Sequence, residues 1–388
     1  MSSVLAAANP AAAVERPIRV MVVDDAIVAR RLLSRWIGDE ADMIVGACLR
    51  TGREALDQLE VCDPDVVVLD VDMPELDGIS ALPLLLKKKR DLVVIMASAL
   101  TRRSAEISLR ALSLGAADYV PKPEAAPDAA MSALFHRELI DKIRNLGRRG
   151  GRGRAPSRRG AAFAGAPSPA TGRSGLLPAA DAVMPALRPF ARVLPRALLI
   201  GASTGGPQAL TSLVGQIGAS IERAPVLITQ HMPPTFTTVL AEHLTRISGH
   251  DVREAEHGEA VVGCRVYLAP GGRHMRVVRD SDGAPVIALG DDPPVNFCKP
   301  AVDPLLSSAA AVWAASSLAL ILTGMGSDGT RGAVAIAAAG GSVIAQDEAT
   351  SVVWGMPRAV AQAGVCSAVL PLGEIAAKVN RLFAGGRT

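Results

Sequence analysis

The segment "LLIGASTGGPQAL", Leu198–Leu210, passes from an apolar run through a glycine-rich turn into the start of a helical pattern. Ser203 stands where the apolar run meets the glycines. This order predicts a strand that ends before Ser203 and a helix that begins just after it, which is the repeating unit of a parallel α/β sheet. Ser203 itself could be a nucleophile, a helix cap or a turn residue.

Runs of the same kind recur on both sides of this segment. Before it, five mostly β-branched runs alternate with amphipathic stretches, and these runs are "RVMVVDD", "MIVGACL", "DVVVLDVD", "LVVIMAS" and "ADYVPKP". After it come "PVLITQH", "RVYLAPGG", "LALILTGMG" and "GSVIAQD". Because buried parallel strands form continuous apolar runs between helices, the sequence predicts an α/β fold with two doubly wound parallel-sheet domains. A last helix of the first domain is predicted over residues 127–146, and the polar stretch 249–259 is predicted to be a loop.

Length and composition place the boundary between the two domains. A chain of 388 residues exceeds the size of one average domain. Residues 143–180 contain no acidic residue and are rich in Arg, Gly, Ala, Pro and Ser, so they cannot bury enough apolar surface to fold. We therefore predict a disordered tail over 1–16, a first domain over 17–146, a flexible linker over 147–194 and a second domain over 195–386.

The composition also argues against several classes of protein. Five scattered cysteines without a C-x-x-C pair favour a reducing cytoplasm over a disulfide framework or a zinc site. The N-terminus lacks the pattern of a signal peptide, and the longest apolar stretch is interrupted by serines, so membrane insertion is not expected. Between Arg148 and Arg173 the linker offers Phe163 as its one aromatic residue for base stacking, so we expect no nucleic-acid partner.

Polar side chains gather at the predicted strand ends of the first domain. Asp24 and Asp25 end the first strand, Asp70 ends the third, Ser98 ends the fourth and Lys122 follows the fifth. Each of them alone could be a helix cap or a solvated charge. Carboxyl ends of parallel strands share one edge of the sheet, so together these residues favour a Mg²⁺ site where a carboxylate accepts a phosphoryl group.

The second domain offers partners for Ser203 at its own strand ends. A serine hydroxyl needs a base to act as a nucleophile, and that base is most often a histidine oriented by a carboxylate. His231 directly ends the apolar run "VLITQ", and Asp328 follows "LALILTG" inside a glycine-rich turn. The three side chains therefore belong to one edge of the predicted sheet, as in the Ser-His-Asp triad of a hydrolase.

A different pairing follows from chain order. The common order in α/β-hydrolases is serine, acid, histidine, and no histidine follows Asp328. In that fold the acid and the base would be Asp251 with His257 or His274. No strand is predicted before Asp251 or His257, so this arrangement is the less favoured one.

The residues from about Ile18 to Leu146 resemble the response-regulator receiver family. Ala26 departs from the small hydroxyl residue that often follows the acid pair in that family, but this side chain is not a metal ligand. The resemblance implies a Mg²⁺ site at Asp24, Asp25 and Asp70 with the backbone carbonyl two residues past Asp70, phosphorylation of Asp70, switch roles for Ser98 and Tyr119, and phosphate binding by Lys122.

From about Pro195 onward, the chain resembles the catalytic domain of the bacterial chemotaxis protein-glutamate methylesterases. The motifs that carry the resemblance are "GASTGGPQAL", "QHMP", "LAPGGRHM", "PPVNFCKPAVDPL", "TGMGSDGTRG" and "AQDEATSVVWGMPRA". The resemblance implies that Ser203 is the nucleophile, His231 the base and Asp328 the residue that orients the base. Backbone N–H groups near Thr204 and Met325 are expected to hold the oxyanion. The "NFC" stretch lies where family members vary and is expected to tune substrate contacts.

Both resemblances together imply a flavodoxin-like receiver followed by a Rossmann-like methylesterase domain. The expected substrates are methyl-accepting chemoreceptors, whose glutamate methyl esters are hydrolysed to release methanol and whose glutamines are deamidated. The ester reaction is expected to need no cofactor, and a chemotaxis histidine kinase is the expected phosphodonor. The unphosphorylated receiver is expected to cover the esterase edge, and phosphorylation of Asp70 to weaken that contact.

Two hypotheses from other classes remain. The second domain could have lost catalysis and act only as a phosphorylation-switched module that docks on receptors, which an assay of methanol release would decide. The chain could also be a receiver-controlled nucleic-acid binder. The second domain has no helix-turn-helix pattern, and a steep salt dependence of DNA binding would be the signature of that activity.

Overall fold

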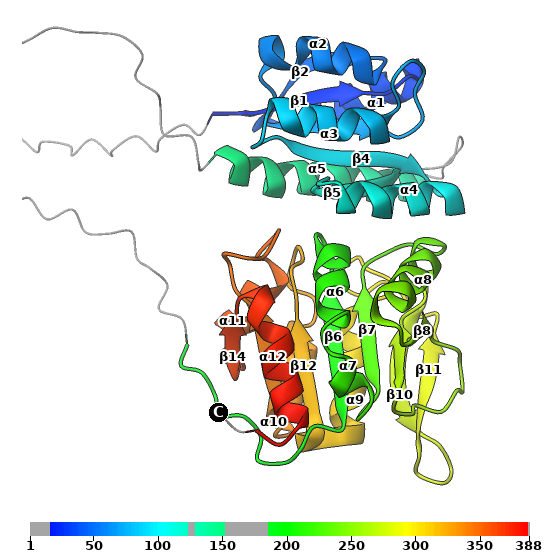
Figure 1. The fold of residues 1–388 in the computed structure, drawn as a ribbon, viewed down its shortest axis with the longest axis vertical. Helices are drawn as coiled ribbons and strands as arrows, with labels where there is room; N and C mark the ends of the chain where they lie inside the picture. Colours follow the sequence, from blue (N-terminus) through cyan, green and yellow to red (C-terminus); the bar gives the residue numbers. More distant parts are fainter. Residues whose placement is uncertain (1–15, 123–128, 152–184, 387–388) are drawn as a thin grey trace, which may run out of the picture. The chain divides into compact units, whose positions relative to one another are not determined.

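The computed structural model describes residues 16–122, 129–151 and 185–386. The predicted N-terminal tail up to residue 15 and residues 152–184 of the predicted linker lie outside the described residues. The chain divides into two compact units (Figure 1), which we take in turn. Among the residues that the structure describes, no helix combines the length and apolar character that a bilayer span requires.

The first unit is built on a five-stranded sheet. All of its strands are parallel, and they lie in the order β2-β1-β3-β4-β5, which is the flavodoxin-like order. The strands are β1 (Ile18–Val23), β2 (Met43–Leu49), β3 (Val66–Asp70), β4 (Val93–Ala99) and β5 (Asp118–Lys122). The helices between and after them are α1 (Ile27–Gly38), α2 (Gly52–Cys62), α3 (Gly78–Lys88), α4 (Arg102–Ser113) and α5 (Ala129–Gly151). The predicted alternation of strands and helices is therefore confirmed.

Helix α5 is longer than the sequence predicted. It continues to Gly151, whereas the prediction ended it at Leu146 and began the linker at the next residue. Gly147 is buried close to the first sheet, where a side chain would come within 2.7 Å of Ile18, and Arg148 donates a hydrogen bond to Asp42 at 3.1 Å. These tertiary contacts stabilise a last turn that composition assigned to the linker.

The second unit contains a seven-stranded parallel sheet in the order β14-β13-β12-β6-β7-β9-β8. Its strands are β6 (Ala197–Ala202), β7 (Val226–Gln230), β8 (Asp251–Glu254), β9 (Arg265–Leu268), β12 (Ser317–Ile321), β13 (Ser342–Gln346) and β14 (Ala368–Leu370). The order reverses at β6, which has β7 on one side and β12 on the other. In such sheets ligands bind in the crevice beyond the carboxyl ends at this reversal.

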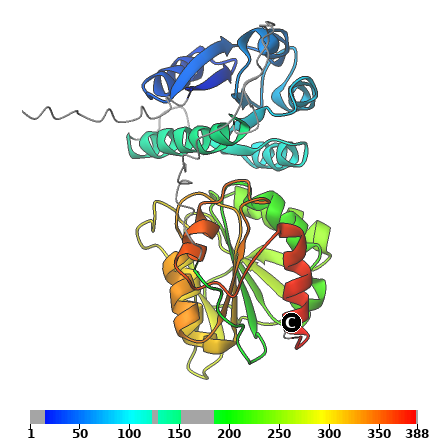
Figure 2. The same cartoon turned by 90° about the vertical axis from the view of Figure 1, so that its left-hand side faces the viewer.

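Helices cover both faces of this sheet (Figure 2), with α9 and α10 on one face and α6, α8 and α12 on the other. The helices are α6 (Gly206–Val214), α7 (Gly218–Ile221), α8 (Phe236–Ser248), α9 (Val302–Trp313), α10 (Thr330–Ala338), α11 (Met356–Gln362) and α12 (Leu372–Phe383), with a 3-10 turn at Ala314–Ser316. Fully buried residues such as Leu305 and Ile336 pack α9 and α10 onto the sheet in one hydrophobic cluster. The carboxyl-end loops are thereby held on a rigid support.

Four parts of this unit differ from the prediction, and one of them is the short edge strand β14, which was not predicted. Residues 249–259 are not all loop, because Asp251–Glu254 form the edge strand β8 with Val252 buried. An antiparallel hairpin of β10 (His274–Arg279) and β11 (Pro285–Gly290) was not predicted. Residues 185–194, assigned to the linker, contact the second unit: Arg188 N–H, for example, donates to the Cys366 carbonyl at 2.8 Å. The edge strand β8 and residues 185–194 depend on contacts with other segments of the chain, which local composition does not reveal.

Candidate active site

The sheet brings the predicted nucleophile and base next to each other. Ala202 and Gln230 are partners at the ends of β6 and β7, so Ser203 and His231 leave the sheet at the same level. His231 N–H donates to the Ala202 carbonyl at 3.1 Å, and Ser203 N–H donates to the Thr323 carbonyl beyond β12 at 3.0 Å. Ser203 therefore lies between the two strands that carry the other triad candidates.

The two glycines after Thr204 are each required for a different structural reason. Gly205 has a φ of +74°, a left-handed conformation that glycine adopts without a steric penalty. A side chain at Gly206 would come within 2.0 Å of Gln230 Oε1. Gln230 is buried and donates from Nε2 to the Ser203 carbonyl at 3.0 Å and to the His231 carbonyl at 3.1 Å. This amide joins the Ser203 turn to His231, and the sequence analysis missed it.

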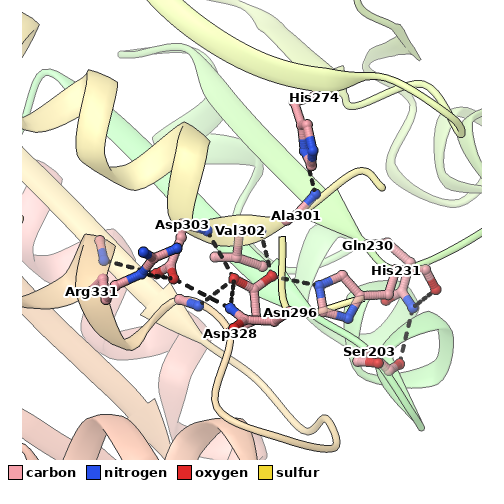
Figure 3. Close-up of polar contacts among 12 residues, drawn as sticks. Ser203, Gln230, His231, His274, Asn296, Ala301, Val302, Asp303, Asp328 and Arg331 are labelled. Atoms are coloured by element: carbon pink, nitrogen blue, oxygen red, sulfur yellow. Dashed lines mark hydrogen bonds and ion pairs between the residues drawn. The ribbon is translucent and has the colours of Figure 1, made fainter. Parts of the chain in front are cut away.

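His231 and Asp328 form a direct side-chain pair. His231 Nε2 lies 2.7 Å from Asp328 Oδ2, and the two side chains are 10% and 2% exposed. The imidazole ring lies between the Asp328 carboxylate and Ser203 (Figure 3), so Nδ1 is the nitrogen left to face the serine. Ser203 is half-buried, which leaves it open to a substrate. The structure thus gathers the three residues that the strand ends predicted.

Asp328 is held by more than His231. Its Oδ2 also accepts the Val302 N–H at 2.6 Å, and its Oδ1 accepts the N–H groups of Asp303 at 3.1 Å and Gly329 at 2.9 Å. Val302 and Asp303 open helix α9, so the carboxylate occupies the positive N-terminal end of that helix. Asn296 Nδ2 adds a further donor to Oδ1 at 3.1 Å.

The electrostatics of the pair suit proton transfer. Burial by itself lowers the pKa of His231, but the interactions with Cys298 and Asp328 outweigh it and raise that pKa to about 10. Burial alone raises the pKa of Asp328, yet the hydrogen bond and charge of His231 and the amides of Val302 and Asp303 bring it below its ordinary value of 3.8. The site therefore stabilises an imidazolium beside a carboxylate, which is the state formed when the base takes a proton.

The two residues predicted for the oxyanion lie in two turns that come close to Ser203. Thr204 is buried directly after it, and its carbonyl accepts the Thr323 hydroxyl at 2.8 Å. Met325 follows Gly324, where a side chain would come within 2.9 Å of Ser203 Cβ. Both turns therefore run close to the serine, and their role with an oxyanion stays a prediction.

The alternative acid–base pairing finds no support in the geometry. Asp251 forms an ion pair with Arg265 at 2.7 Å. His257 Nδ1 accepts the Leu289 N–H at 3.1 Å. His274 is fully buried, where Nδ1 accepts the Ala301 N–H and Nε2 lies 3.1 Å from the Pro293 carbonyl. Each of these side chains is engaged in structural contacts.

A second cluster lies at the carboxyl ends of the first unit's strands. Ligand atoms of Asp24, Asp25 and Asp70 lie within 4.8 Å of one another, and hard oxygen donors of this kind suit Mg²⁺. Lys122 Nζ lies 2.6 Å from Asp24 Oδ2 and 2.7 Å from Asp70 Oδ1. Burial raises the pKa of Asp70, and the charge of Lys122 opposes that shift. These four residues are among the five that the strand ends predicted for this site, and the fifth is Ser98.

The remaining predicted switch residues are buried in the same unit. Ser98 is buried at the second-last position of β4, where it pairs with Pro121 on β5, and the last residue Ala99 pairs with Lys122. Tyr119 is 4% exposed, and burial raises the pKa of its phenol well above the ordinary value. The Lys142 ammonium donates to the Tyr119 carbonyl at 2.6 Å and lies 5.2 Å from the ring centre.

Comparison with known proteins relates both units to described families. Residues 198–379 match the CheB methylesterase family, and residues 20–134 match the response regulator receiver domain family. The protein-glutamate methylesterase/protein-glutamine glutaminase of group 2 operon from Bradyrhizobium diazoefficiens is 61% identical over 388 residues, which span 96% of each chain. This chain belongs to the protein-glutamate methylesterase/protein-glutamine glutaminase family.

Other similar proteins carry the same description. A family member from Rhodopseudomonas palustris is 59% identical over 391 residues and is covered, like this chain, over its full length. The solved methylesterase catalytic domain of Thermotoga maritima CheB is 40% identical, with a TM-score of 0.47, and covers 49% of this chain and all of that chain. The family resemblance drawn from the motifs is confirmed.

Sequence reasoning missed the contacts of three polar residues with members of the predicted triad, namely Gln230, Asn296 and Asp303. Asp303 is buried, and its carboxylate accepts the Gly332 N–H of α10 at 2.8 Å and pairs with Arg331 at 3.0 Å. The only signal in the sequence was a polar side chain inside an otherwise apolar motif. That signal does not say which distant backbone groups the side chain meets.

Proposed function

We propose that this chain hydrolyses γ-glutamyl methyl esters of methyl-accepting chemoreceptors in the cytoplasm and deamidates receptor glutamines, with Ser203, His231 and Asp328 as a catalytic triad. The observation that carries the proposal is the 2.7 Å contact between His231 Nε2 and Asp328 Oδ2, on a ring that lies between Asp328 and Ser203. These three groups follow the parallel strands β6, β7 and β12, whose carboxyl ends meet where the strand order reverses.

The reaction proceeds by acyl transfer. The Ser203 hydroxyl oxygen attacks the ester carbonyl carbon while His231 Nδ1 takes the hydroxyl proton. The oxyanion is held by backbone N–H groups at Thr204 and near Met325. The C–O bond to methoxide breaks, His231 returns the proton, and methanol leaves. Water then attacks the acyl-enzyme, again losing a proton to His231, and the glutamate carboxylate and Ser203 hydroxyl are restored.

Asp328 supports both proton transfers. It accepts the Nε2–H of His231, which fixes the tautomer that leaves Nδ1 unprotonated for the serine. Its charge then stabilises the imidazolium. Deamidation of a glutamine follows the same steps with ammonia as the leaving group. The proposed route uses protein groups alone.

The receiver unit supplies control. We assign Asp70 as the phosphoacceptor, with Asp24, Asp25 and Asp70 holding Mg²⁺ and Lys122 holding phosphoryl oxygens. When bound, Mg²⁺ polarises the incoming phosphoryl group. Ser98 and Tyr119 are the switch residues, and a chemotaxis histidine kinase is the proposed phosphodonor. Phosphorylation of Asp70 is proposed to raise the esterase activity of the same chain.

The test is methanol release from methylated receptor membranes. Wild type and Ser203→Ala are compared side by side, each with and without a small phosphodonor, together with Asp70→Ala. We expect Ser203→Ala to be inactive under all conditions, and Asp70→Ala to keep basal activity without stimulation. Full activity in Ser203→Ala would end the nucleophile assignment. Stimulation of Asp70→Ala would end the proposed route of control.

A further inference from the structure

A strained turn lies beside the Asp328 carboxylate. Val295 and Cys298 pair as an antiparallel bridge, with backbone hydrogen bonds of 3.1 and 2.9 Å between them. The two residues at its tip, Asn296 and Phe297, have φ values of +51° and +65°. Asparagine tolerates this left-handed region, but phenylalanine rarely adopts it. Such a conformation persists where the surrounding structure holds it in place, and it is concentrated at functional sites.

Buried polar contacts hold both ends of the segment that carries this turn. His274 Nε2 lies 3.1 Å from the Pro293 carbonyl, and its Nδ1 accepts the Ala301 N–H at 3.1 Å. His274 has no exposed surface. One imidazole therefore fixes the chain shortly before and shortly after the turn.

The turn places the Asn296 amide between two buried carboxylates. Asn296 Nδ2 donates to Asp328 Oδ1 at 3.1 Å and lies 3.4 Å from Asp303 Oδ2 (Figure 3). Each carboxylate accepts hydrogen bonds from the helix next to the other. Asp328 accepts the first N–H groups of α9, the helix that contains Asp303. Asp303 accepts the Gly332 N–H of α10, the helix that begins just after Asp328. The Asn296 amide therefore donates to Asp328 Oδ1, while His231 contacts the other carboxylate oxygen, Oδ2.

We propose that Asn296 is a positioning residue of the esterase, which holds the Asp328 carboxylate in the orientation that pairs it with His231. The inference rests on the proposed triad. With Oδ1 tied to Asn296 and to backbone N–H groups, rotation of the carboxylate about its Cβ–Cγ bond is opposed, and Oδ2 stays directed at His231. Asn296 does not touch the reacting atoms, so its loss lowers kcat and leaves the KM for receptor esters unchanged.

Asn296→Gly and Phe297→Gly form a matched pair for the test. Glycine adopts a positive φ without strain at either position, so both variants keep the turn, but only Asn296→Gly removes the donor to Asp328. A hydrogen bond to a charged group corresponds to about tenfold in rate. We expect Asn296→Gly to lower kcat for methanol release about tenfold at unchanged KM. Phe297→Gly lies in the stretch expected to tune substrate contacts, so it is expected to change KM and to show no loss of kcat of this size. Should Asn296→Gly not fold, Asn296→Asp keeps the shape of the side chain without an N–H donor and is expected to lower kcat at least as far.

An Asp328→Asn background shows whether Asn296 acts through Asp328. Two residues that act through one contact give non-additive effects. Asn296→Gly is therefore expected to lower kcat by less than twofold further in Asp328→Asn. An equal fractional loss in both backgrounds, a kcat within twofold of wild type, or a rise in KM alone would overturn the proposal. Full activity of Asp328→Asn itself would instead overturn the triad, so the two failures are distinguishable.

Discussion

Replacing Asp328 by alanine separates two roles that the structure gives to one carboxylate. The substitution removes the acceptor for His231 Nε2, which is the catalytic contact. It also removes the acceptor for the N–H groups of Val302, Asp303 and Gly329, which lie at the starts of helices α9 and α10. Ser203→Ala removes a half-buried hydroxyl and none of these contacts. Both variants should therefore lose activity, but only Asp328→Ala should also lose stability.

The magnitudes follow from the contacts. Loss of the orienting acid in a Ser-His-Asp triad lowers the rate by about 10⁴, which is about 5 kcal/mol of transition-state stabilisation at 1.36 kcal/mol per tenfold. Each buried N–H left without an acceptor costs about 1–3 kcal/mol. Three such backbone groups give Asp328→Ala a loss of at least about 3 kcal/mol in the stability of these helix starts. Ser203→Ala should change stability by less than about 1 kcal/mol.

The assay combines methanol release with amide hydrogen exchange across residues 300–332. In Asp328→Ala the first-turn amides of α9 and α10 should exchange at least about a hundredfold faster than in wild type, since 1.4 kcal/mol is a factor of ten in the opening equilibrium. In Ser203→Ala they should exchange as in wild type. Equal exchange in the two variants would show that Asp328 does not hold the helix starts. Wild-type methanol release by Asp328→Ala would remove it from catalysis.

Three further outcomes are expected. A histidine acts as a base only when it is neutral. Because the pKa of His231 is raised, we expect the acid limb of the kcat/KM–pH profile to lie above pH 6.5. Cys298→Ala removes one cause of the raised pKa and should move this limb to lower pH. Gly324→Ala puts a Cβ within 2.9 Å of Ser203 Cβ, so kcat for methanol release should fall at least about tenfold, while phosphorylation of the receiver, followed with radiolabelled phosphodonor, stays unchanged. Chelation of Mg²⁺ with EDTA should abolish labelling of Asp70 but leave basal methanol release as it was, and loss of both would contradict separate sites.

Much of the fold follows from local patterns in the sequence. The central strands β1, β3 and β4 coincide with mainly apolar runs, because a strand buried on both faces carries few polar residues along its length. The polar residue that ends such a run marks the edge of the sheet. That rule selected Asp70 and His231. Asp328 was selected because it lies in the glycine-rich turn just past a strand, and the glycines after Ser203 marked the turn that carries this serine.

The same rule failed where a strand is short or lies at an edge. Strand β8 carries Asp251, Arg253 and Glu254 and buries only Val252, so its composition is that of a loop. Its pairing with β9 is what makes it a strand. Helix α5 likewise continues past its predicted end because Gly147 and Arg148 meet residues of the first sheet and of the turn before β2.

The amino-acid sequence by itself determined the alternation of strands and helices, the level at which each strand ends, and hence which side chains share an edge. Only the tertiary structure decided which backbone and side-chain groups surround those side chains. Gln230, Asn296 and Asp303 act on groups far away along the chain, and a hydrogen bond depends on distance and angle between atoms, which spacing in sequence does not encode. The proposed catalytic residues are visible locally because strand and helix alternate regularly along the chain, whereas the contacts that hold these residues come from loops and helix ends without such a regular pattern.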